Sequence, residues 1–306
     1  MREVYMAQVA LLVRLLPIVA EETDFALKGG TEINLFHRDL PRLSVDIDLT
    51  YLPIGERAAS LAAIDAAMDR IASNVERLVP GAVPRRMPGG GGHETRLLVR
   101  LDQAQVKIEV SPVARGTLHA PKAMQTSETV QEQYGYAEIQ VVSFEDLYGG
   151  KLHAALDRQH PRDLFDIALL YENEGMDDQL LRAFLVYLAC SNRPPHELID
   201  PGLPDLDRAY LQEFAGMTRI AVSADGLQAT RSRLITDIQS RLDENAADFL
   251  LSLHDGQPNF EAIGLPQALD LPAVQWKLKN IQRLVRENSE KHSEQREALE
   301  ALVRRR

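Results

Sequence analysis

The stretch Ser44-Val45-Asp46-Ile47-Asp48-Leu49 alternates aspartates with large apolar residues. Side chains in a β-strand point alternately to opposite faces, so the pattern predicts a strand whose apolar side chains enter the core while Asp46 and Asp48 project together from the other face. Two carboxylates this close repel unless a cation lies between them, and hard oxygen ligands of this kind suit Mg²⁺. Taken alone, the pair is explained better by a solvated strand face or an ion-paired edge.

Upstream, Phe25-Ala26-Leu27 is predicted to be a short strand that ends at Lys28-Gly29-Gly30-Thr31, and residues 32–38 are predicted to form one or two helical turns. Backbone N–H groups and the positive end of that helix can meet a phosphate near the aspartates. A tight turn that needs glycine geometry is the alternative. Farther along, residues 89–92 are expected to be a loop and not a second phosphate cradle, because no Gly-Lys-Ser/Thr follows them.

A third carboxylate is expected from the next alternating stretch, Val106-Lys107-Ile108-Glu109-Val110. Its alternation places Lys107 and Glu109 opposite the apolar face, so Glu109 can join the two aspartates. A solvent-facing hairpin strand explains the same stretch nearly as well.

Two cations lie on the helix expected from Phe144. Lys151 and Arg158 are seven residues apart, hence on one face, where they could take up triphosphate charge or simply be surface cations. Asp163 follows Pro161, which is well placed to begin another helix. Asp163 complements the dipole of that helix, orients Lys151 or Arg158, or acts as a base, and the sequence leaves these roles open.

Strand and helix patterns divide the chain into two parts. We predict an α+β fold, with a mixed α/β domain over residues 1–142 and an all-helical domain over residues 143–306. The predicted strands cover residues 25–27, 44–51, 94–101, 105–113 and 139–142, and the predicted helices cover 55–78, 144–157, 162–172, 178–189, 205–216, 224–241, 244–253 and 272–287.

Composition excludes several classes of protein. The 306 residues carry 34 basic and 45 acidic side chains, a net charge of −11 that argues against a protein whose whole surface coats nucleic acid. Cys190 is the single cysteine, so no internal disulfide forms and a reducing cytoplasm fits. Arg14 interrupts the apolar run over residues 9–20, which predicts an amphipathic helix and no export signal, and nothing approaches a membrane span.

Positive charge is nevertheless concentrated locally. Residues 80–123 sum to +4, as do residues 274–306. Both segments are candidate RNA-binding surfaces, with Arg85 and Arg86 as the cations to test in the first. The alternative for the second segment is a solvated amphipathic helix.

Taken together, these motifs resemble the AbiEii/AbiGii toxin family, which includes the MenT toxins of mycobacteria and belongs to the DNA polymerase β-like nucleotidyltransferase superfamily. The Gly-Gly and Asp-x-Asp core is shared by the whole superfamily, whereas the helix pair is more specific. Thr31 departs mildly from the family, since many relatives have serine there. The motifs are Lys28-Gly29-Gly30-Thr31, Asn34-Leu35-Phe36, residues 44–49, the helix pair with Lys151, Ala155, Arg158, Arg162, Asp163 and Asp166, and the later stretches 192–195 and 272–280.

The resemblance implies a polymerase β-like catalytic domain, completed by the helical domain, that uses Mg²⁺ or Mn²⁺ to transfer a nucleotide from a nucleoside triphosphate (NTP). The implied acceptor is RNA, with the 3′ end of a tRNA as the expected site, and the implied partner is a cognate antitoxin. The implied roles are metal binding by Asp46, Asp48 and Glu109, with Glu109 alternatively a base, phosphate or nucleotide binding by Lys28, Gly29, Gly30, Thr31, Ser44 and Arg158, charge neutralisation by Lys151, and a catalytic part for Asp163.

Two other functions remain open at this point. The same catalytic core could transfer a nucleotide to a small molecule such as an aminoglycoside, or to a protein. A non-catalytic nucleotide-binding or partner-binding module is the third hypothesis.

Overall fold

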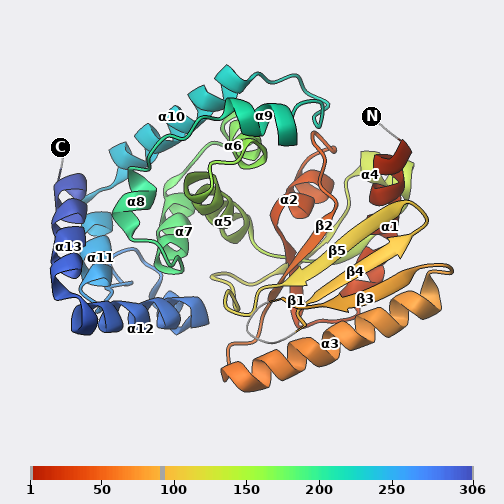
Figure 1. Ribbon diagram of the computed structural model, residues 1–306, viewed down its shortest axis with the longest axis horizontal. Coiled ribbons are helices and arrows are strands. Elements are labelled where there is room, and N and C mark those ends of the chain that lie inside the picture. The colour runs from red at the N-terminus through yellow and green to blue at the C-terminus, as the bar shows by residue number, and fades with distance from the viewer. Residues whose placement is uncertain (1–2, 90–93, 305–306) are drawn as a thin grey trace. The chain divides into compact units, whose positions relative to one another are not determined.

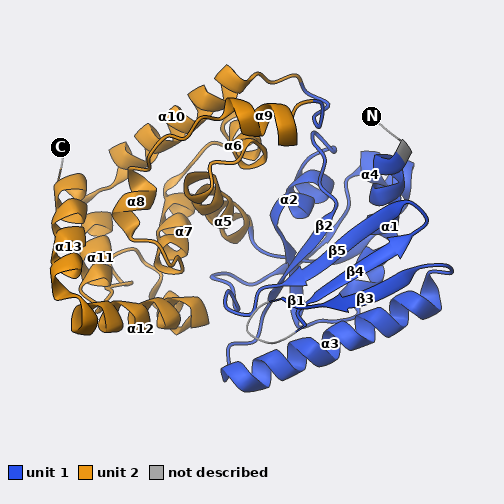
Figure 2. Ribbon diagram, viewed as in Figure 1, with its two compact units in different colours: residues 1–143, 216–220 blue, residues 144–215, 221–306 orange. Residues whose placement is uncertain are grey.

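The computed structural model describes residues 3–89 and 94–304. Gly90, Gly91 and Gly92 of the predicted loop lie outside these residues. The chain divides into two compact units (Figure 2), one of residues 1–143 and 216–220 and the other of residues 144–215 and 221–306. The expected boundary at residue 142 falls one residue before the first division, whereas no sequence signal indicates that residues 216–220 join the first unit.

The described residues of the first unit form a seven-stranded mixed sheet in the order β3-β4-β5-β2-β1-β7-β6 (Figure 1). The pairs β2/β5 and β1/β7 are parallel, and the other neighbours are antiparallel. The strands are β1 (Phe25–Lys28), β2 (Asp46–Tyr51), β3 (Val83–Met87), β4 (Arg96–Leu101), β5 (Ala104–Val110), β6 (Lys122–Gln125) and β7 (Glu138–Val141).

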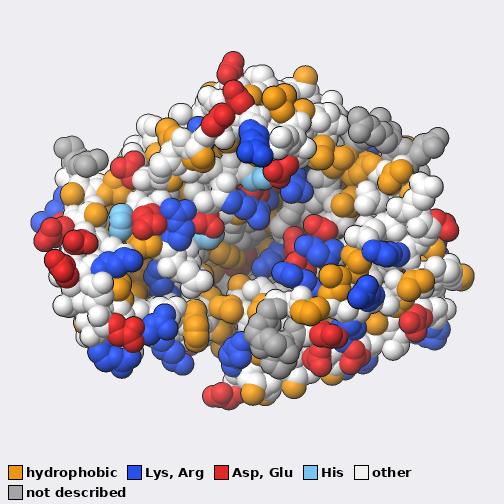
Figure 3. All heavy atoms as spheres, in the orientation of Figure 1, with side chains coloured by type: hydrophobic (Ala, Val, Ile, Leu, Met, Phe, Trp, Pro, Cys, Tyr) orange, Lys and Arg blue, Asp and Glu red, His pale blue; other side chains and the backbone are white. Residues whose placement is uncertain are grey.

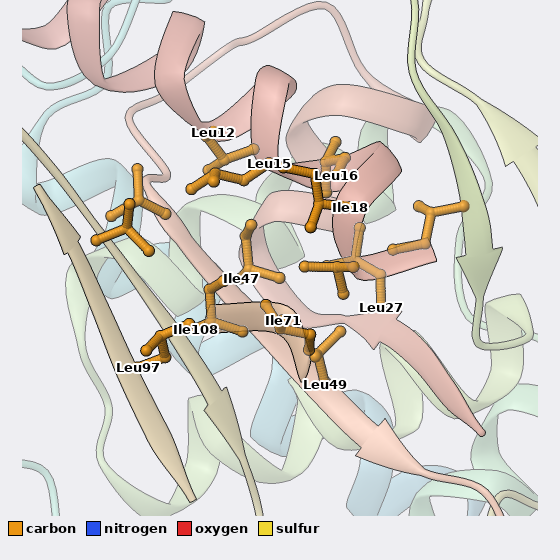
Figure 4. Packing of buried hydrophobic residues seen from close by; sticks show 14 of the residues in the cluster. Leu12, Leu15, Leu16, Ile18, Leu27, Ile47, Leu49, Ile71, Leu97 and Ile108 are labelled. Atoms are coloured by element: carbon orange, nitrogen blue, oxygen red, sulfur yellow. The ribbon is translucent and has the colours of Figure 1, made fainter. Parts of the chain in front are cut away.

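Two long helices, α1 (Glu3–Ala20) and α3 (Arg57–Leu78), cover the apolar face of this sheet. Figure 4 shows Leu12 and Leu16 of α1 packed over Ile47 of β2 and Ile108 of β5, with Ile71 of α3 in the same cluster. Because side chains alternate along a strand, the polar residues of β2 and β5 project from the opposite face. The other helical segments are α2 (Gly29–Glu32), the π-helix η1 (Ile33–His37) and α4 (Glu128–Tyr134).

The second unit is all-helical over its described residues. Side-chain caps begin several of its helices, as where Asp177 accepts a hydrogen bond from the Leu180 N–H and Asp243 accepts one from Ala246. Its elements are α5 (Phe144–Asp157), α6 (Pro161–Asn173), α7 (Asp178–Ala189), α8 (Pro195–Ile199), α9 (Asp207–Glu213), α10 (Ala224–Arg241), α11 (Glu244–His254), η2 (Pro266–Asp270), α12 (Pro272–Glu287) and α13 (Ser289–Val303).

Close packing of α5 on α7 depends on Gly149. A Cβ atom there would lie 2.9 Å from Cδ2 of Tyr187, closer than side-chain atoms tolerate. The Tyr187 hydroxyl donates a hydrogen bond to Asp146 at 3.0 Å, which fixes the ring between the two helices. This contact fixes the position of α5 against α7. Helix α5 carries Lys151 and ends just before Arg158.

The predicted α+β class is confirmed, as are the helices over residues 144–157, 178–189, 224–241 and 272–287. The helix predicted over residues 205–216 is shorter than expected, and β3, β6, α4, α8 and α13 were not predicted. The N-terminal apolar run is a helix, as expected, although most of it is buried. None of the helices in the described ranges has the length and apolar character that crossing a membrane requires.

Candidate active site

Asp46 and Asp48 lie on the same face of β2, as the alternation predicts. Both side chains are half-buried, whereas Ile47 between them and Leu49 after them are fully buried in the core. Asp48 is in register with Lys28 of β1 on one side and with Glu109 of β5 on the other. The sheet therefore gathers the predicted polar residues on its second face.

The charge of Asp48 is only partly compensated. Burial raises the pKa of Asp48, Lys28 lowers it, and the neighbouring charge of Asp46 raises it again, with the net pKa above its ordinary value. A nearby cation would stabilise the ionised form of such a carboxylate, because its positive charge offsets both the cost of burial and the repulsion from Asp46. The Asp46–Asp48 face therefore fits a divalent cation with oxygen ligands.

Glu109 is held by two cations of its own face. Arg96 Nε donates to Oε1 of Glu109 at 2.7 Å, and Lys107 Nζ lies 2.9 Å from Oε2. Burial raises the pKa of Glu109, but the hydrogen bonds from Lys107 and Arg96 outweigh it and the net pKa is lowered. Lys107 Nζ also lies 3.8 Å from Oδ2 of Asp46.

A third metal ligand is not preformed within the described residues. They contain no group of three histidine, cysteine, aspartate or glutamate side chains that could hold a metal together. Glu109 is beside Asp48 but is engaged by Arg96 and Lys107, so a metal role for Glu109 requires exchange of those ion pairs and stays a prediction.

The Gly29–Gly30 turn approaches the aspartates closely. Gly29 has a φ of +79°, and a Cβ atom there would lie 3.2 Å from Oδ2 of Asp48. A Cβ atom on Gly30 would lie 2.6 Å from Nη2 of Arg42 and 2.9 Å from Oγ of Ser44. A side chain at either position would therefore require a neighbouring side chain to shift, and the backbone of both glycines lies beside the carboxylate face.

Arg42 lies beside the Gly29–Gly30 turn and was not predicted from the sequence to be part of the site. Its side chain is almost fully buried, its Nη1 donates to the Leu43 carbonyl at 2.7 Å, and its guanidinium lies against Gly30. The main chain around it is fixed by residues 216–220, since Arg42 forms a β-bridge with Thr218 and Leu43 N–H donates to the Met217 carbonyl at 2.9 Å. This long-range pairing could not be inferred from the residues near Arg42.

Thr31 and Ser44 connect the turn to β2. The Thr31 hydroxyl donates to the main-chain carbonyl of Asp46 and lies 3.1 Å from Oγ of Ser44. Asn34 Nδ2 donates to the Gly30 carbonyl at 2.6 Å. Thr31 is buried, so its position supports the geometry of the turn, and its predicted contact with phosphate stays a prediction.

A separate ionic cluster lies within the helical unit, around Lys151. Lys151 Nζ lies 3.0 Å from Oδ1 of Asp163 and 2.9 Å from Oδ2 of Asp166, and all three side chains are buried. Arg158 Nε donates to Oδ2 of Asp163 at 2.6 Å, and the Arg158 side chain is 63% exposed. Burial raises the pKa of Asp163, but Lys151 and Arg158 outweigh it and hold the pKa well below its ordinary value.

These contacts favour one of the three roles that the sequence left open for Asp163. A carboxylate held ionised by two cations is a poor base, because its proton affinity is low. Its geometry suits the positioning of Lys151 and Arg158.

The expected basic surface of residues 80–123 is wrong in part. Arg86 is paired with both Asp65 and Asp69 of α3, and Arg96 and Lys107 are paired with Glu109. Asp65 and Asp69 lie outside residues 80–123 and neutralise Arg86, whereas Glu109 lies within the segment and is already counted in its charge of +4. Arg85, in contrast, is exposed.

Comparison with known proteins adds a family match. The model for the nucleotidyl transferase AbiEii toxin family of type IV toxin–antitoxin systems matches residues 10–280. Among solved structures, MenT4, a nucleotidyltransferase toxin from Mycobacterium tuberculosis H37Rv, superposes with a TM-score of 0.60 and 15% identity over 92% of this chain and 95% of that chain. No curated protein sequence matches the chain. At this identity the structural likeness supports the fold, whereas the family match spans most of the sequence.

Proposed function

The chain belongs to the AbiEii family of nucleotidyltransferase toxins, and from this premise we propose that it transfers a nucleotide from an NTP to an RNA acceptor, at the 3′ end of a tRNA. Such transfer forms a new phosphodiester bond at the α-phosphorus and releases pyrophosphate. The observation that carries the proposal is the half-buried pair Asp46 and Asp48, which projects beside the Gly29–Gly30 turn.

The family uses an NTP and a divalent metal ion, and we propose Mg²⁺ as that ion. Asp46 and Asp48 would hold it, and when bound it would supply positive charge that offsets the charge of the triphosphate. The uncompensated charge of Asp48 supports this assignment. A cognate antitoxin is the partner that membership of a toxin–antitoxin family implies.

Residues around the turn would bind and orient the nucleotide. Because Gly29 and Gly30 have no side chains, their backbone N–H groups would be able to approach a phosphate closely. Arg42 adds a buried guanidinium beside Gly30, and an arginine fork matches phosphate oxygens. Thr31 and Ser44 would keep the turn in this position through their contacts with each other and with β2.

An RNA acceptor is favoured by the exposed face of α12. Trp276, Lys279, Arg283 and Arg286 recur at intervals of three and four residues, so they lie on one side of the helix, opposite the buried Lys277 and Ile281. Trp276 is 49% exposed, and the Arg283 and Arg286 side chains are 61% and 76% exposed. In Figure 3, Lys and Arg side chains gather over α12.

This arrangement fits a polyanion with exposed bases. Aromatic side chains provide stacking platforms for unpaired bases, and neighbouring cations contact the phosphates. A small-molecule or protein acceptor would not need such a stripe. We name the side chains of Trp276, Lys279, Arg283 and Arg286 the α12 stripe.

The deciding experiment combines the purified protein with each of four labelled NTPs, Mg²⁺ and total tRNA, and then maps the modified end. Label is expected in tRNA with the wild-type chain and with the exposed control Asp39→Asn, but with neither Asp46→Ala nor Asp48→Ala. Label in an aminoglycoside or a protein, but not in RNA, would replace the proposed acceptor. Metal-dependent NTP binding without any transfer would overturn the proposed reaction.

A further inference from the structure

A cavity of about 240 Å³ lies among α8, α11, α12 and α13 of the helical unit. None of the residues of the carboxylate face or the Lys151 cluster lines it. Among the described residues that line it, Glu197 is the only carboxylate. Its polar lining consists mainly of two lysines and three side-chain amides, namely Lys277, Lys291, Asn192, Asn280 and Gln295.

Lys277 is a buried cation in this lining. Lys277 is only 6% exposed, and its Nζ donates a hydrogen bond to the main-chain carbonyl of Arg193 at 2.7 Å. No carboxylate of the described residues forms an ion pair with it, and Glu197 is engaged by Arg193 at 3.2 Å. Burying an ammonium group without a counter-ion is costly, and burial lowers the pKa of Lys277 to about 8.

The amide groups around Lys277 are available as donors. Asn192, Asn280 and Gln295 make no side-chain hydrogen bond to any described residue. Lysine is a compact point charge that suits phosphate, and a phosphoryl group offers several acceptor oxygens with close to two negative charges. The cavity is smaller than the ~300–1,000 Å³ of sites for drug-sized ligands, so a small ligand fits it best.

We propose that this pocket binds a phosphoryl group, as free phosphate or as part of a small phosphorylated compound, with Lys277 as its buried counter-ion and Lys291 as the second cation. The amides of Asn192, Asn280 and Gln295 supply the neutral hydrogen bonds. This site is independent of the proposed transfer reaction, because no residue of the carboxylate face takes part in it.

The test follows the ε-methylene signal of Lys277 by NMR in protein labelled with ¹³C-lysine. The signal is assigned by its loss in Lys277→Met. Titration in chloride is expected to give a midpoint near 8, and millimolar inorganic phosphate at equal ionic strength is expected to move the midpoint upward. Lys122, an exposed lysine of β6 that lies outside the cavity, is the control, and its signal is expected to be the same in chloride and in phosphate at each pH. Glycerol phosphate and AMP, compared with inorganic phosphate, then show which source of the phosphoryl group binds more tightly.

Thermal unfolding provides a second measurement that does not depend on assignment. Phosphate is expected to raise the midpoint of thermal unfolding of the wild-type protein and of Lys122→Met, but not of Lys277→Met, which replaces the buried ammonium by an apolar side chain of similar length. The proposal is overturned if the Lys277 midpoint is the same in chloride and in phosphate. It is overturned equally if phosphate stabilises Lys277→Met as much as the wild type, because the gain then comes from another site.

Discussion

Lys151 Nζ lies 3.0 Å from Oδ1 of Asp163, and the exposed fraction of each side chain is less than a tenth. Asp166 shares the same ammonium group, and Arg158 contacts Asp163 from the solvent side. The cluster is thus part of the core of the helical unit as well as a candidate catalytic feature. Tests of Lys151 therefore have to separate folding from chemistry.

Replacing Lys151 by methionine is expected to destabilise the protein. The variant keeps the length of the side chain but leaves the carboxylates of Asp163 and Asp166 buried without their shared cation. Breaking a buried ion pair from one side costs about 3–5 kcal/mol. Urea denaturation measures the loss, with the exposed Lys279→Met as the control that should change the free energy of unfolding by less than about 0.5 kcal/mol. A loss below about 1 kcal/mol for Lys151→Met would show that the cluster is not structural.

The low pKa of Asp163 predicts a contribution to stability that depends on pH. Its pKa is lower in the folded than in the unfolded chain, where it is about 3.9, so the contribution is complete above that value and is lost as the pH falls toward the folded pKa. Wild type is therefore expected to exceed Asp163→Asn in stability at pH 7, with a difference that narrows below about pH 4. A difference that stays constant from pH 7 to pH 3 contradicts this assignment.

Asp48→Asn is expected to abolish nucleotide transfer while stabilising the fold at neutral pH. The pKa of Asp48 is raised in the folded chain, so the folded state is favoured below the unfolded pKa and loses stability as the pH rises through the folded pKa. The Asp48→Asn substitution removes the carboxylate charge and therefore the loss of stability that its ionisation causes. At pH 7, Asp48→Asn is expected to have a higher melting temperature than the wild-type protein. The control Asp39→Asn is expected to have the same melting temperature as the wild type. A lower melting temperature for Asp48→Asn would mean that the ionised carboxylate is well compensated.

Gly29→Ala and Gly175→Ala form a matched pair. The two glycines have φ values of +79° and +77°, so alanine should cost each of them about 1–2 kcal/mol of backbone strain. Only at Gly29 does the added Cβ atom meet a functional side chain, 3.2 Å from Oδ2 of Asp48, whereas nothing lies within 4 Å at Gly175. Similar losses of stability are expected, with a strong loss of transfer activity for Gly29→Ala alone. Equal activities would remove the turn from the site.

The strand positions of Asp46, Asp48 and Glu109 were predictable because burial of one sheet face imposes a period of two on the sequence. Helices such as α7 and α10 were predictable because burial of one helix face and the residues at the helix ends also leave a local pattern in the sequence. Edge strands carry a weaker signal. In β3, Val83–Met87, arginines and a proline hide the alternation, since an edge strand buries little of either face.

The environment of each charge was not predictable. Glu109 is in the expected place, but its ion pair with Arg96 depends on the register of β4 on β5, which places these residues opposite each other. Arg86 meets Asp65 and Asp69 only because α3 packs beside β3. The charge sum of residues 80–123 therefore overestimates the basic surface at Arg86, because its partners Asp65 and Asp69 lie outside the summed segment.

The α12 stripe gives a prediction that can be measured without any enzymatic step. Trp276 is the single tryptophan of the chain, so intrinsic tryptophan fluorescence reports on this position alone. An unstructured single-stranded RNA oligonucleotide is expected to quench the fluorescence, because a base stacks on the exposed indole. Asp46→Ala should bind in the same way, which separates RNA binding from catalysis.

Charge reversal shows whether the cations of the stripe contact phosphates. Lys279→Glu with Arg283→Glu is expected to weaken binding and to reduce the slope of log affinity against log salt by about 1–2, since each phosphate contact on a single strand contributes about 0.7. Arg283 and Arg286 lie 4.0 and 3.8 Å from Glu287. Exposed ion pairs this long are weak, so Glu287 competes little with RNA phosphates for these arginines. Arg208→Glu changes an exposed arginine of the same unit and should leave the slope unchanged. If all three proteins share one slope, RNA binds elsewhere, and the exposed Arg85 becomes the next residue to reverse.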